Sequence, residues 1–287
     1  MFDINKICVV GGDIRQAYLG DMFLKDGKFV TYQALEKCEY AQPDYASLET
    51  AVSKCDTVIL PVPLSKDGQT LNTPLSDMTI PLDSEFADIL KNKCVFCANS
   101  DMLTKSGNYE SCRIFDYMKN EDLVVLNAAL TAEAALGIAI NNSDISILKS
   151  KCLVAGFGRI GKFLARELKF LGADVTASAR KSSDMAWITA CGYTAVETEN
   201  IAENIGEFDF IFNTIPHMIF NTNVISKISR NAVIIDLASK PGGTDFETCR
   251  KMNIKAISAL SLPGKTAPKS AAEIIKNTIY KLSEEKT

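Results

Sequence analysis

The chain has 287 residues, of which 47% are hydrophobic and 23% are charged, as expected for a globular protein with room for two domains. Its net charge of −4 gives no support for nucleic-acid binding, and its first residues lack the apolar run of a signal peptide. The most apolar segment, residues 123–140, is interrupted by Asn127, Thr131 and Glu133, which favours a buried helix over a membrane span.

Nine cysteines are scattered through strand-like segments, which indicates a reduced, cytoplasmic protein. Cys94 and Cys97 have the spacing of a redox or zinc pair. No second pair follows, however, and the chain contains a single histidine. We therefore expect these two thiols to pack in a core, and we expect no metal site.

The first half of the chain alternates strand-like and helical segments. Strands are predicted at residues 6–10, 29–33, 57–60, 94–97 and 123–126, and a helix begins at about Ile14. This alternation predicts a mostly parallel sheet in a substrate-side α/β domain over residues 1–126. An apolar helix at about 128–140 follows, within an interdomain segment over residues 127–150.

Three segments of the first half carry candidate substrate-binding residues. Asp13, Arg15 and Gln16 follow the first strand, where a helix start and a guanidinium suit a carboxylate, although a surface turn explains them equally well. Ser65 lies in a loop that prolines stiffen. It could contact a ligand, but a purely structural role for the loop is at least as well supported. Asn127 and Thr131 enter the apolar helix.

The second half repeats the α/β alternation, with strands predicted at residues 151–155, 174–178, 208–213, 232–237 and 254–258. We expect a Rossmann domain over residues 151–264. The last segment, residues 265–287, has apolar residues at helical spacing from about Pro268, and by analogy with two-domain dehydrogenases its helix crosses back to the first domain. The fold class is thus two Rossmann-like α/β domains with parallel sheets and an interdomain cleft.

The strongest motif is Gly156-x-Gly158-x-x-Gly161, which lies between an apolar strand and an amphipathic helix. In this context the first glycine permits a tight turn, the second lets a pyrophosphate approach the backbone, and the third lets helix and strand pack closely. Arg159 and Ile160 open the helix, whose N-terminal amides and dipole favour phosphate.

The next strand predicts which dinucleotide binds. An NAD site usually ends this strand with Asp or Glu, but here the strand runs into Ala179, Arg180, Lys181 and Ser182. Two cations and a hydroxyl suit a ribose 2′-phosphate, which predicts NADP over NAD. A solvated basic turn is the alternative.

Later loops supply the remaining candidates. Asn213, Thr214 and Pro216, and then Leu237, Ala238 and Ser239, follow two strands and are expected to contact the cofactor. The catalytic candidates are Glu133, His217 and Lys240, with Lys269 as a further substrate-binding cation. Alternatives remain for three of these four residues: Glu133 could favour a helix dipole, Pro216 could hold His217 outward, and Lys269 could lie in a solvated turn.

Together these motifs resemble the family of the dipicolinate synthase A subunit over nearly the whole chain. The residues that carry the resemblance are 11–16, 59–62, 156–161, 213–216, 236–239, 241–246, 262–264 and 267–269. Two positions depart from the family pattern. Lys240 stands where an arginine is expected, and His217 is not expected at all.

The resemblance implies oxidation, with loss of water, of the small dicarboxylate 4-hydroxy-tetrahydrodipicolinate to dipicolinate by NADP. It further implies a partner, the flavoprotein-like B subunit of dipicolinate synthase, in the mother-cell cytoplasm of a sporulating bacterium. We also expect a homo-oligomer and no membrane or nucleic-acid partner. Two alternatives remain: a two-domain 2-hydroxyacid-type dehydrogenase, or a non-catalytic nucleotide-binding subunit.

Overall fold

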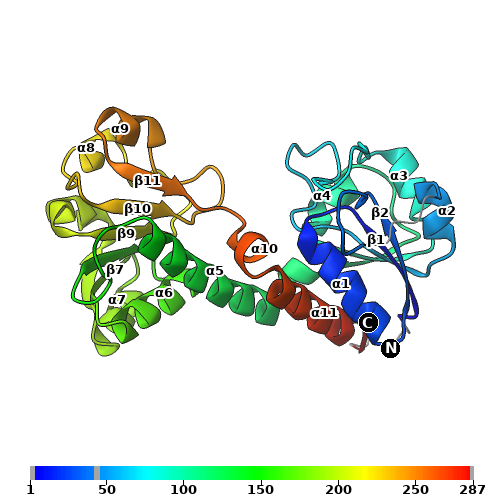
Figure 1. The fold of residues 1–287 in the computed structure, drawn as a ribbon, viewed down its shortest axis with the longest axis horizontal. Coiled ribbons are helices and arrows are strands. Elements are labelled where there is room, and N and C mark those ends of the chain that lie inside the picture. Colours follow the sequence, from blue (N-terminus) through cyan, green and yellow to red (C-terminus); the bar gives the residue numbers. More distant parts are fainter. Residues whose placement is uncertain (1–3, 42–45, 285–287) are drawn as a thin grey trace. The chain divides into compact units, whose positions relative to one another are not determined.

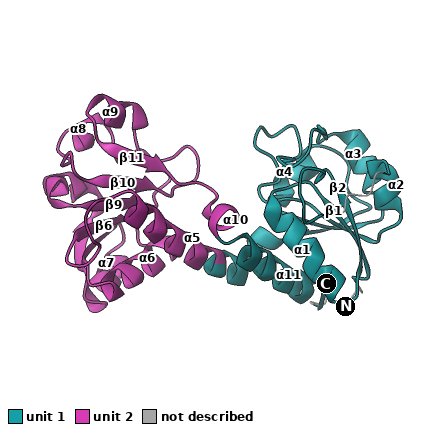
Figure 2. Cartoon of the chain, in the orientation of Figure 1, with its two compact units in different colours: residues 1–126, 267–287 teal, residues 127–266 magenta. Residues whose placement is uncertain are grey.

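The computed structural model describes residues 4–41 and 46–284, and the chain divides into two compact units (Figure 2). Unit 1 comprises Met1–Leu126 together with Ala267–Thr287. Unit 2 comprises Asn127–Thr266. Each unit is an α/β domain with a parallel sheet.

Unit 1 contains a five-stranded sheet in the order β2-β1-β3-β4-β5. Figure 1 labels its first two strands, β1 and β2. All four strand pairs are parallel. In this order the chain turns back between β1 and β3, and ligands of such sheets bind outside the carboxyl ends of the strands at that point. The strands are β1 Lys6–Val10, β2 Phe29–Gln33, β3 Thr57–Ile59, β4 Cys94–Cys97 and β5 Arg113–Asp116.

Helices cover both faces of this sheet, because successive side chains of each strand point to opposite faces. Ile7 and Val9 of β1 pack on the side of α1 and α11, whereas Cys8 and Val10 pack on the side of α2 and α3. The helices of unit 1 are α1 Ile14–Lys25, α2 Leu48–Ser53, α3 Ser84–Ile89, α4 Ser100–Lys105, the 3-10 turn η1 Tyr117–Lys119, and α11 Pro268–Glu284.

The C-terminal helix α11 packs against α1 within unit 1. Its apolar face, with Ala272, Ile275 and Ile279, enters the same core as α1. Lys276 Nζ and Tyr280 Oη both donate to Asp26 at the end of α1, at 2.8 and 2.9 Å. The helical spacing of apolar residues in this segment therefore reflects burial against the first half of the chain.

The CxxC pair lies on β4, and both thiols are buried. Burial raises the pKa of Cys94 and of Cys97 to about 12, so neither is a thiolate at neutral pH. Within residues 4–41 and 46–284, no group of three or more His, Cys, Asp or Glu side chains could hold a metal ion. The two cysteines pack as small apolar side chains.

Unit 2 contains a six-stranded parallel sheet in the order β11-β10-β9-β6-β7-β8. One face packs on α5, α6 and α7, and the other on η2, α8 and α9. Its helix α5, Glu121–Asn141, begins within unit 1 and continues into unit 2 from Asn127. The other elements are β6 Lys151–Ala155, α6 Arg159–Phe170, β7 Asp174–Ala179, α7 Ser182–Ala190, β8 Thr194–Glu197, η2 Thr198–Glu203, η3 Ile205–Glu207, β9 Phe210–Asn213, α8 Thr222–Ile225, β10 Val233–Asp236, α9 Phe246–Lys251, β11 Lys255–Ser258 and α10 Leu262–Thr266.

The strand predicted at residues 123–126 is wrong, because this segment lies inside α5. Asn120 accepts a hydrogen bond from Leu123 N at 3.2 Å, and Glu121 and Asp122 place negative charge in the first turn, so the helix begins earlier than its apolar run suggests. Glu133 is consequently a mid-helix residue, and the dipole alternative for it no longer applies.

By length and composition, α5 is the one helix in the described ranges that could cross a membrane, a test that core helices of globular proteins also pass. Ala132, Ala135, Leu136 and Ala139 pack in the core of unit 2. The helix is partly rather than wholly buried, since Leu126 and Ile140 are more than half exposed.

Candidate functional site

A groove of about 270 Å³ lies at the carboxyl edge of the unit 2 sheet. Three loops meet there because parallel strands all end at the same edge. The first follows β6, the second follows β7, and the third follows β9. The lining residues are Gly156, Phe157, Gly158, Ala179, Arg180, Lys181, Asp184, Thr198, Thr214, Ile215 and Pro216. Of these, Phe157, Asp184, Thr198 and Ile215 were not predicted.

The three fingerprint glycines have three different environments. Gly156 has φ +96°, which L side chains rarely adopt, and a Cβ there would lie 2.5 Å from Thr214 Oγ1. A Cβ on Gly161 would lie 2.1 Å from Gly156 O, so this glycine permits the close packing of α6 on the loop. A Cβ on Gly158 would meet nothing within 4 Å. The space next to Gly158 is therefore free of protein atoms.

The start of α6 faces the same loop. Gly158 is its N-cap and offers no side-chain hydrogen bond, and the i to i−4 bonds of the helix begin with Lys162 N, which donates to Gly158 O at 2.9 Å. The amides of Ile160 and Gly161 precede this bond, so they have no acceptor within the helix. This twelve-residue helix therefore presents amide donors and a positive dipole to a phosphate. The Ile160 side chain packs against the core, and only its backbone can serve a cofactor.

Charged residues gather where β7 ends. Arg180, Lys181 and Asp184 line this end of the groove together with Thr198. In the described part of the chain, neither cation is engaged in an ion pair. Asp184 could have been anticipated because it lies in the first turn of α7, directly after the loop that contains Arg180 and Lys181. Two cations and one carboxylate give this end of the groove, beside the last residue of β7, a formal net charge of +1.

Asn213 lies behind the groove rather than on it. Its side chain is fully buried, and Nδ2 donates to Ile215 O at 3.2 Å and to Asp236 Oδ1 at 3.1 Å. Its Oδ1 accepts from Ile215 N at 3.0 Å. Because these bonds use both amide hydrogens and the carbonyl oxygen, Asn213 acts on a ligand only through the loop of Thr214 and Pro216.

Asp236 is the centre of this buried network and was not among the predicted site residues. Besides Asn213, its carboxylate accepts from Ala238 N at 2.9 Å and from Gly243 N at 3.2 Å. Gly243 completes the arrangement, since a Cβ there would lie 2.3 Å from Asn213 Nδ2. The loops after β9 and β10 are thus held together from within the protein.

The other predicted cofactor and catalytic residues of unit 2 lie around this network. Leu237 and Ala238 are buried, whereas Ser239 and Lys240 are exposed on the loop that follows. Arg159 and Ser182 begin α6 and α7, outside the lining of the groove. His217 is exposed and has no hydrogen-bond partner among the described residues. The structure therefore supplies no carboxylate to orient His217 as a base.

Arg15 of unit 1 is 5% exposed and already paired. Its Nε and Nη2 donate to the two oxygens of Asp13 at 2.8 and 2.7 Å, and Nη2 also donates to Val62 O at 2.6 Å. Gln16 is likewise buried and donates to Leu60 O at 3.0 Å. These residues join the start of α1 to the loop after β3, at the point where the strand order of the sheet reverses. Of the three guanidinium nitrogens of Arg15, only Nη1 then remains for a ligand.

The remaining predicted substrate residues are dispersed. Ser65 Oγ donates to Asp67 at 2.9 Å and accepts from Gly68 N, which uses its hydroxyl within the loop. Thr131 Oγ1 donates to Asn127 O at 2.8 Å along α5, and Glu133 is exposed on the same helix. Lys269 is exposed in the first turn of α11, in unit 1. The structure brings none of Glu133, His217 and Lys240 into hydrogen-bond contact.

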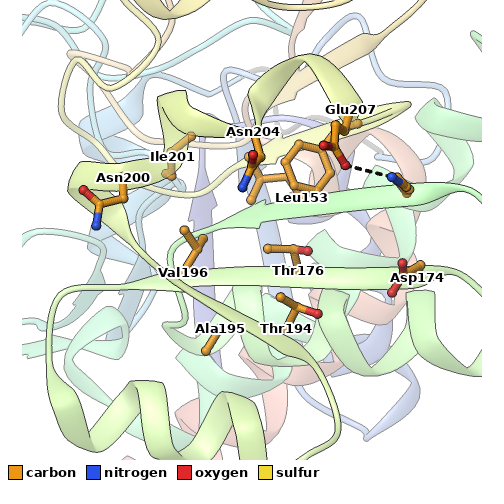
Figure 3. Close-up of a pocket in the computed structure, with 12 residues that line it drawn as sticks. Leu153, Asp174, Thr176, Thr194, Ala195, Val196, Asn200, Ile201, Asn204 and Glu207 are labelled. Carbon is orange, nitrogen blue, oxygen red and sulfur yellow. Dashed lines mark hydrogen bonds and ion pairs between the residues drawn. The ribbon is translucent and has the colours of Figure 1, made fainter.

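A second hollow of unit 2, of about 280 Å³, lies over β6, β7 and β8 beneath η2 and η3 (Figure 3). Thr176 and Thr194 come from neighbouring strands, and an ion pair of 2.8 Å between Lys151 and Glu207 lies at one end. Asp174, the first residue of β7, lines this hollow and not the groove. The lining of this second hollow includes the first residues of β6 and β7, so the hollow lies away from the carboxyl edge of the sheet, where the groove is.

Comparison with known proteins gives matches to both units. Residues 6–118 match the N-terminal domain of the dipicolinate synthase A subunit, and residues 140–240 match the NAD-binding domain of D-isomer specific 2-hydroxyacid dehydrogenases. The dipicolinate synthase A subunit of Bacillus subtilis (strain 168) is 31% identical over 285 residues, which covers 98% of this chain and 96% of the relative.

Solved structures agree over the same length. The crystal structure of the dipicolinate synthase A subunit from Bacillus halodurans superposes with a TM-score of 0.82 at 26% identity and covers 98% of both chains. The corresponding chain of dipicolinate synthase from Bacillus subtilis superposes with a TM-score of 0.81 at 30% identity, covering 98% of this chain and 96% of that one.

Proposed function

This chain belongs to the family of the dipicolinate synthase A subunit, and we propose that it oxidises 4-hydroxy-tetrahydrodipicolinate to dipicolinate with NADP. Its second unit is a dehydrogenase-type domain for a nicotinamide cofactor. The observation that carries the proposal is the open space at Gly158, in front of the N-terminus of α6, in a chain of this family. A dinucleotide needs both features for its pyrophosphate.

The proposed reaction balances with one cofactor. The substrate loses water and gives up one hydride and one proton, so the products are dipicolinate, water, NADPH and a proton. When bound, NADP⁺ supplies the hydride acceptor. The chain's own contribution is to hold the pyrophosphate at Gly158 and α6 and to position the loop of Thr214 and Pro216 through Asn213 and Asp236. Formation of an aromatic ring supplies driving force, so alignment is the main requirement.

We expect turnover by the purified chain. It would be incubated with NADP⁺ and freshly prepared 4-hydroxy-tetrahydrodipicolinate, and the absorbance of NADPH and of dipicolinate would be followed. The two products should appear in equal amounts. Parallel reactions that include the flavoprotein-like B subunit show whether that proposed partner is required. Absence of both products in every mixture, with NADPH binding intact, would instead favour another substrate or the non-catalytic alternative.

NADP rather than NAD is supported by the two unpaired cations where β7 ends. A ribose 2′-phosphate beside Arg180 and Lys181 would gain charge-assisted hydrogen bonds, each contributing roughly 1.5–3 kcal/mol. Asp184 works in the opposite direction, because a carboxylate accepts a bond from a free 2′-hydroxyl and repels a phosphate. The preference therefore depends on two cations outweighing one carboxylate.

The double variant Arg180→Ala with Lys181→Ala should weaken NADPH binding by about 10- to 100-fold while NADH binding changes little. Asp184→Asn should act in reverse and strengthen NADPH. Lys169→Ala, which removes an exposed cation at the other end of α6, is the matched control and should change neither. Affinities would be measured by titration calorimetry. An equal loss for both dinucleotides would show that the cations do not contact a 2′-phosphate.

The family name implies assembly with another subunit. We propose the flavoprotein-like B subunit of dipicolinate synthase for that role, with homo-oligomerisation of this chain and action in the mother-cell cytoplasm. The 2-hydroxyacid dehydrogenase alternative gains no support from the candidate base. Its histidine should pair with a carboxylate, whereas His217 is exposed and has no such partner in the described residues.

A further inference from the structure

Unit 1 contains a cavity of about 390 Å³ that none of the predicted substrate residues except Ser65 lines. It lies where β3, β4 and β5 end, between the loop of residues 62–65, the start of α4, and η1. Small-molecule sites have volumes of roughly 300–1,000 Å³, so this one suits a ligand much smaller than a dinucleotide. It also occupies the edge of the sheet at which ligands of such folds bind.

The walls of the cavity are mainly apolar. Val62 and Pro63 form one part, Met102 of α4 and Met118 of η1 form another, and all four are only partly buried. Methionine side chains adapt to flat rings, and their sulfur makes favourable contacts with aromatic groups. The walls therefore fit a planar heterocycle.

Two lining residues have hydrogen-bond donors to spare. Lys119 Nζ donates to Asp101 Oδ1 at 2.8 Å and to Ser100 Oγ at 3.1 Å, which leaves one of its three hydrogens. Asn99 accepts from Met102 N through Oδ1 at 3.1 Å, and its Nδ2 has no partner among the described residues. Donors on a cation and on an amide are what a carboxylate requires.

The other polar lining residues are already engaged. Asp116 accepts from Ser100 N at 2.7 Å and from Met118 N at 3.0 Å, so backbone amides stabilise its charge. Ser65 is bonded within its own loop. Lys119 is the one cation in the lining, and the hydrogen bond to Asp101 raises its pKa, which keeps it charged at neutral pH.

We propose that this cavity binds the ring and one carboxylate of a pyridine-type dicarboxylate, with the ring against Met102 and Met118 and the carboxylate on Lys119 Nζ and Asn99 Nδ2. The proposal rests on the proposed function and adds the residues that recognise its substrate class. It also agrees with the environment of Arg15. That side chain is hydrogen-bonded to Asp13 and Val62, and the proposal does not require it as the principal residue that binds a carboxylate.

The test measures binding of dipicolinate to the full chain by titration calorimetry, with pyridine-2-carboxylate and the neutral pyridine-2-carboxamide as further probes. Lys119→Met should weaken both carboxylates by about 10-fold or more, leave the carboxamide unchanged, and leave NADPH affinity unchanged. Asp101→Asn releases Lys119 from its ion pair without entering the cavity, so carboxylate binding should be equal or tighter. Lys105→Met removes an exposed cation of α4 outside the cavity and should have no effect.

Two results would overturn the inference. One is wild-type affinity for both carboxylates in the Lys119→Met chain, and the other is absence of dipicolinate binding by the wild-type chain. Turnover of 4-hydroxy-tetrahydrodipicolinate by the wild-type chain is measured separately. If turnover occurs while Lys119→Met binds normally, the proposed function stands and only the assignment of this cavity fails.

Discussion

A chain carrying Gly158→Val should melt at the wild-type temperature yet lose NADPH affinity by about 100-fold or more, equivalent to roughly 2.7 kcal/mol. The reason is geometric. A Cβ at Gly158 would meet no protein atom within 4 Å, and φ is −79°, so valine fits the folded chain. The same side chain would occupy the space through which a pyrophosphate reaches the backbone. Thermal melting and calorimetric titration measure the two effects separately.

Gly161→Val, at the third residue of α6, provides the matched control. Its Cβ would lie 2.1 Å from Gly156 O, a backbone atom that cannot turn aside, so we expect a loss of stability of about 1–3 kcal/mol or more. Gly158→Val should therefore lower NADPH affinity without changing stability, whereas Gly161→Val should lower the stability of the fold. Normal NADPH affinity in the Gly158→Val chain would remove the fingerprint loop from the cofactor site.

Asp236→Ala should lower the free energy of unfolding of unit 2 by about 2–4 kcal/mol and should also weaken NADPH binding. Removing the carboxylate leaves Ala238 N and Gly243 N without their acceptor in the interior, and Asn213 Nδ2 keeps only its bond to Ile215 O. At roughly 3 °C for each kcal/mol, the melting temperature should fall by about 6–12 °C. Binding suffers because Asn213, whose bonds to Ile215 shape the loop of Thr214 and Pro216, then loses its own anchor at the end of β10.

Asp245→Ala is the control for this network. Asp245 lies on the same loop but caps α9, accepting from Thr248 N at 3.0 Å, and it has no contact with Asn213. We expect a smaller fall in melting temperature and an unchanged NADPH affinity. If the Asp236→Ala chain bound NADPH as tightly as wild type at a temperature where both are folded, Asn213 and Asp236 would be purely structural.

Much of the fold could be predicted because strand and helix periods depend on the local order of apolar residues. Strands such as Phe29–Gln33 and Lys151–Ala155 were predicted with the observed bounds. The errors arose where local order is ambiguous. A short apolar run at residues 123–126 satisfies either period, and only the length of α5 and its cap at Asn120 decide for a helix. The strands β5 and β8 were missed because half-exposed side chains leave little apolar pattern.

The candidate site likewise contains residues that local sequence predicts and residues that only the fold brings together. The spacing of Gly156, Gly158 and Gly161 already indicates a phosphate-binding turn, because the strand, the turn and the helix that carry it follow one another directly in the chain. Arg180 and Lys181 likewise follow directly from the end of their strand. By contrast, Asn213 and Asp236 are 23 residues apart and meet only because β9 and β10 are neighbours in the sheet. No local pattern distinguishes a buried amide that braces a loop from one that touches a ligand.

The sequence by itself therefore determined the α/β class, the fingerprint turn and the cationic end of the groove, because these depend on contacts between residues close in the chain. Tertiary structure alone decided that Arg15 is committed to Asp13 and Val62, that Asp184 and Thr198 line the groove at the carboxyl edge of the unit 2 sheet, and that Asn99 and Lys119 share a cavity. Those facts depend on which strand ends lie side by side, and on which hydrogen-bond donors remain once buried polar groups have found their partners.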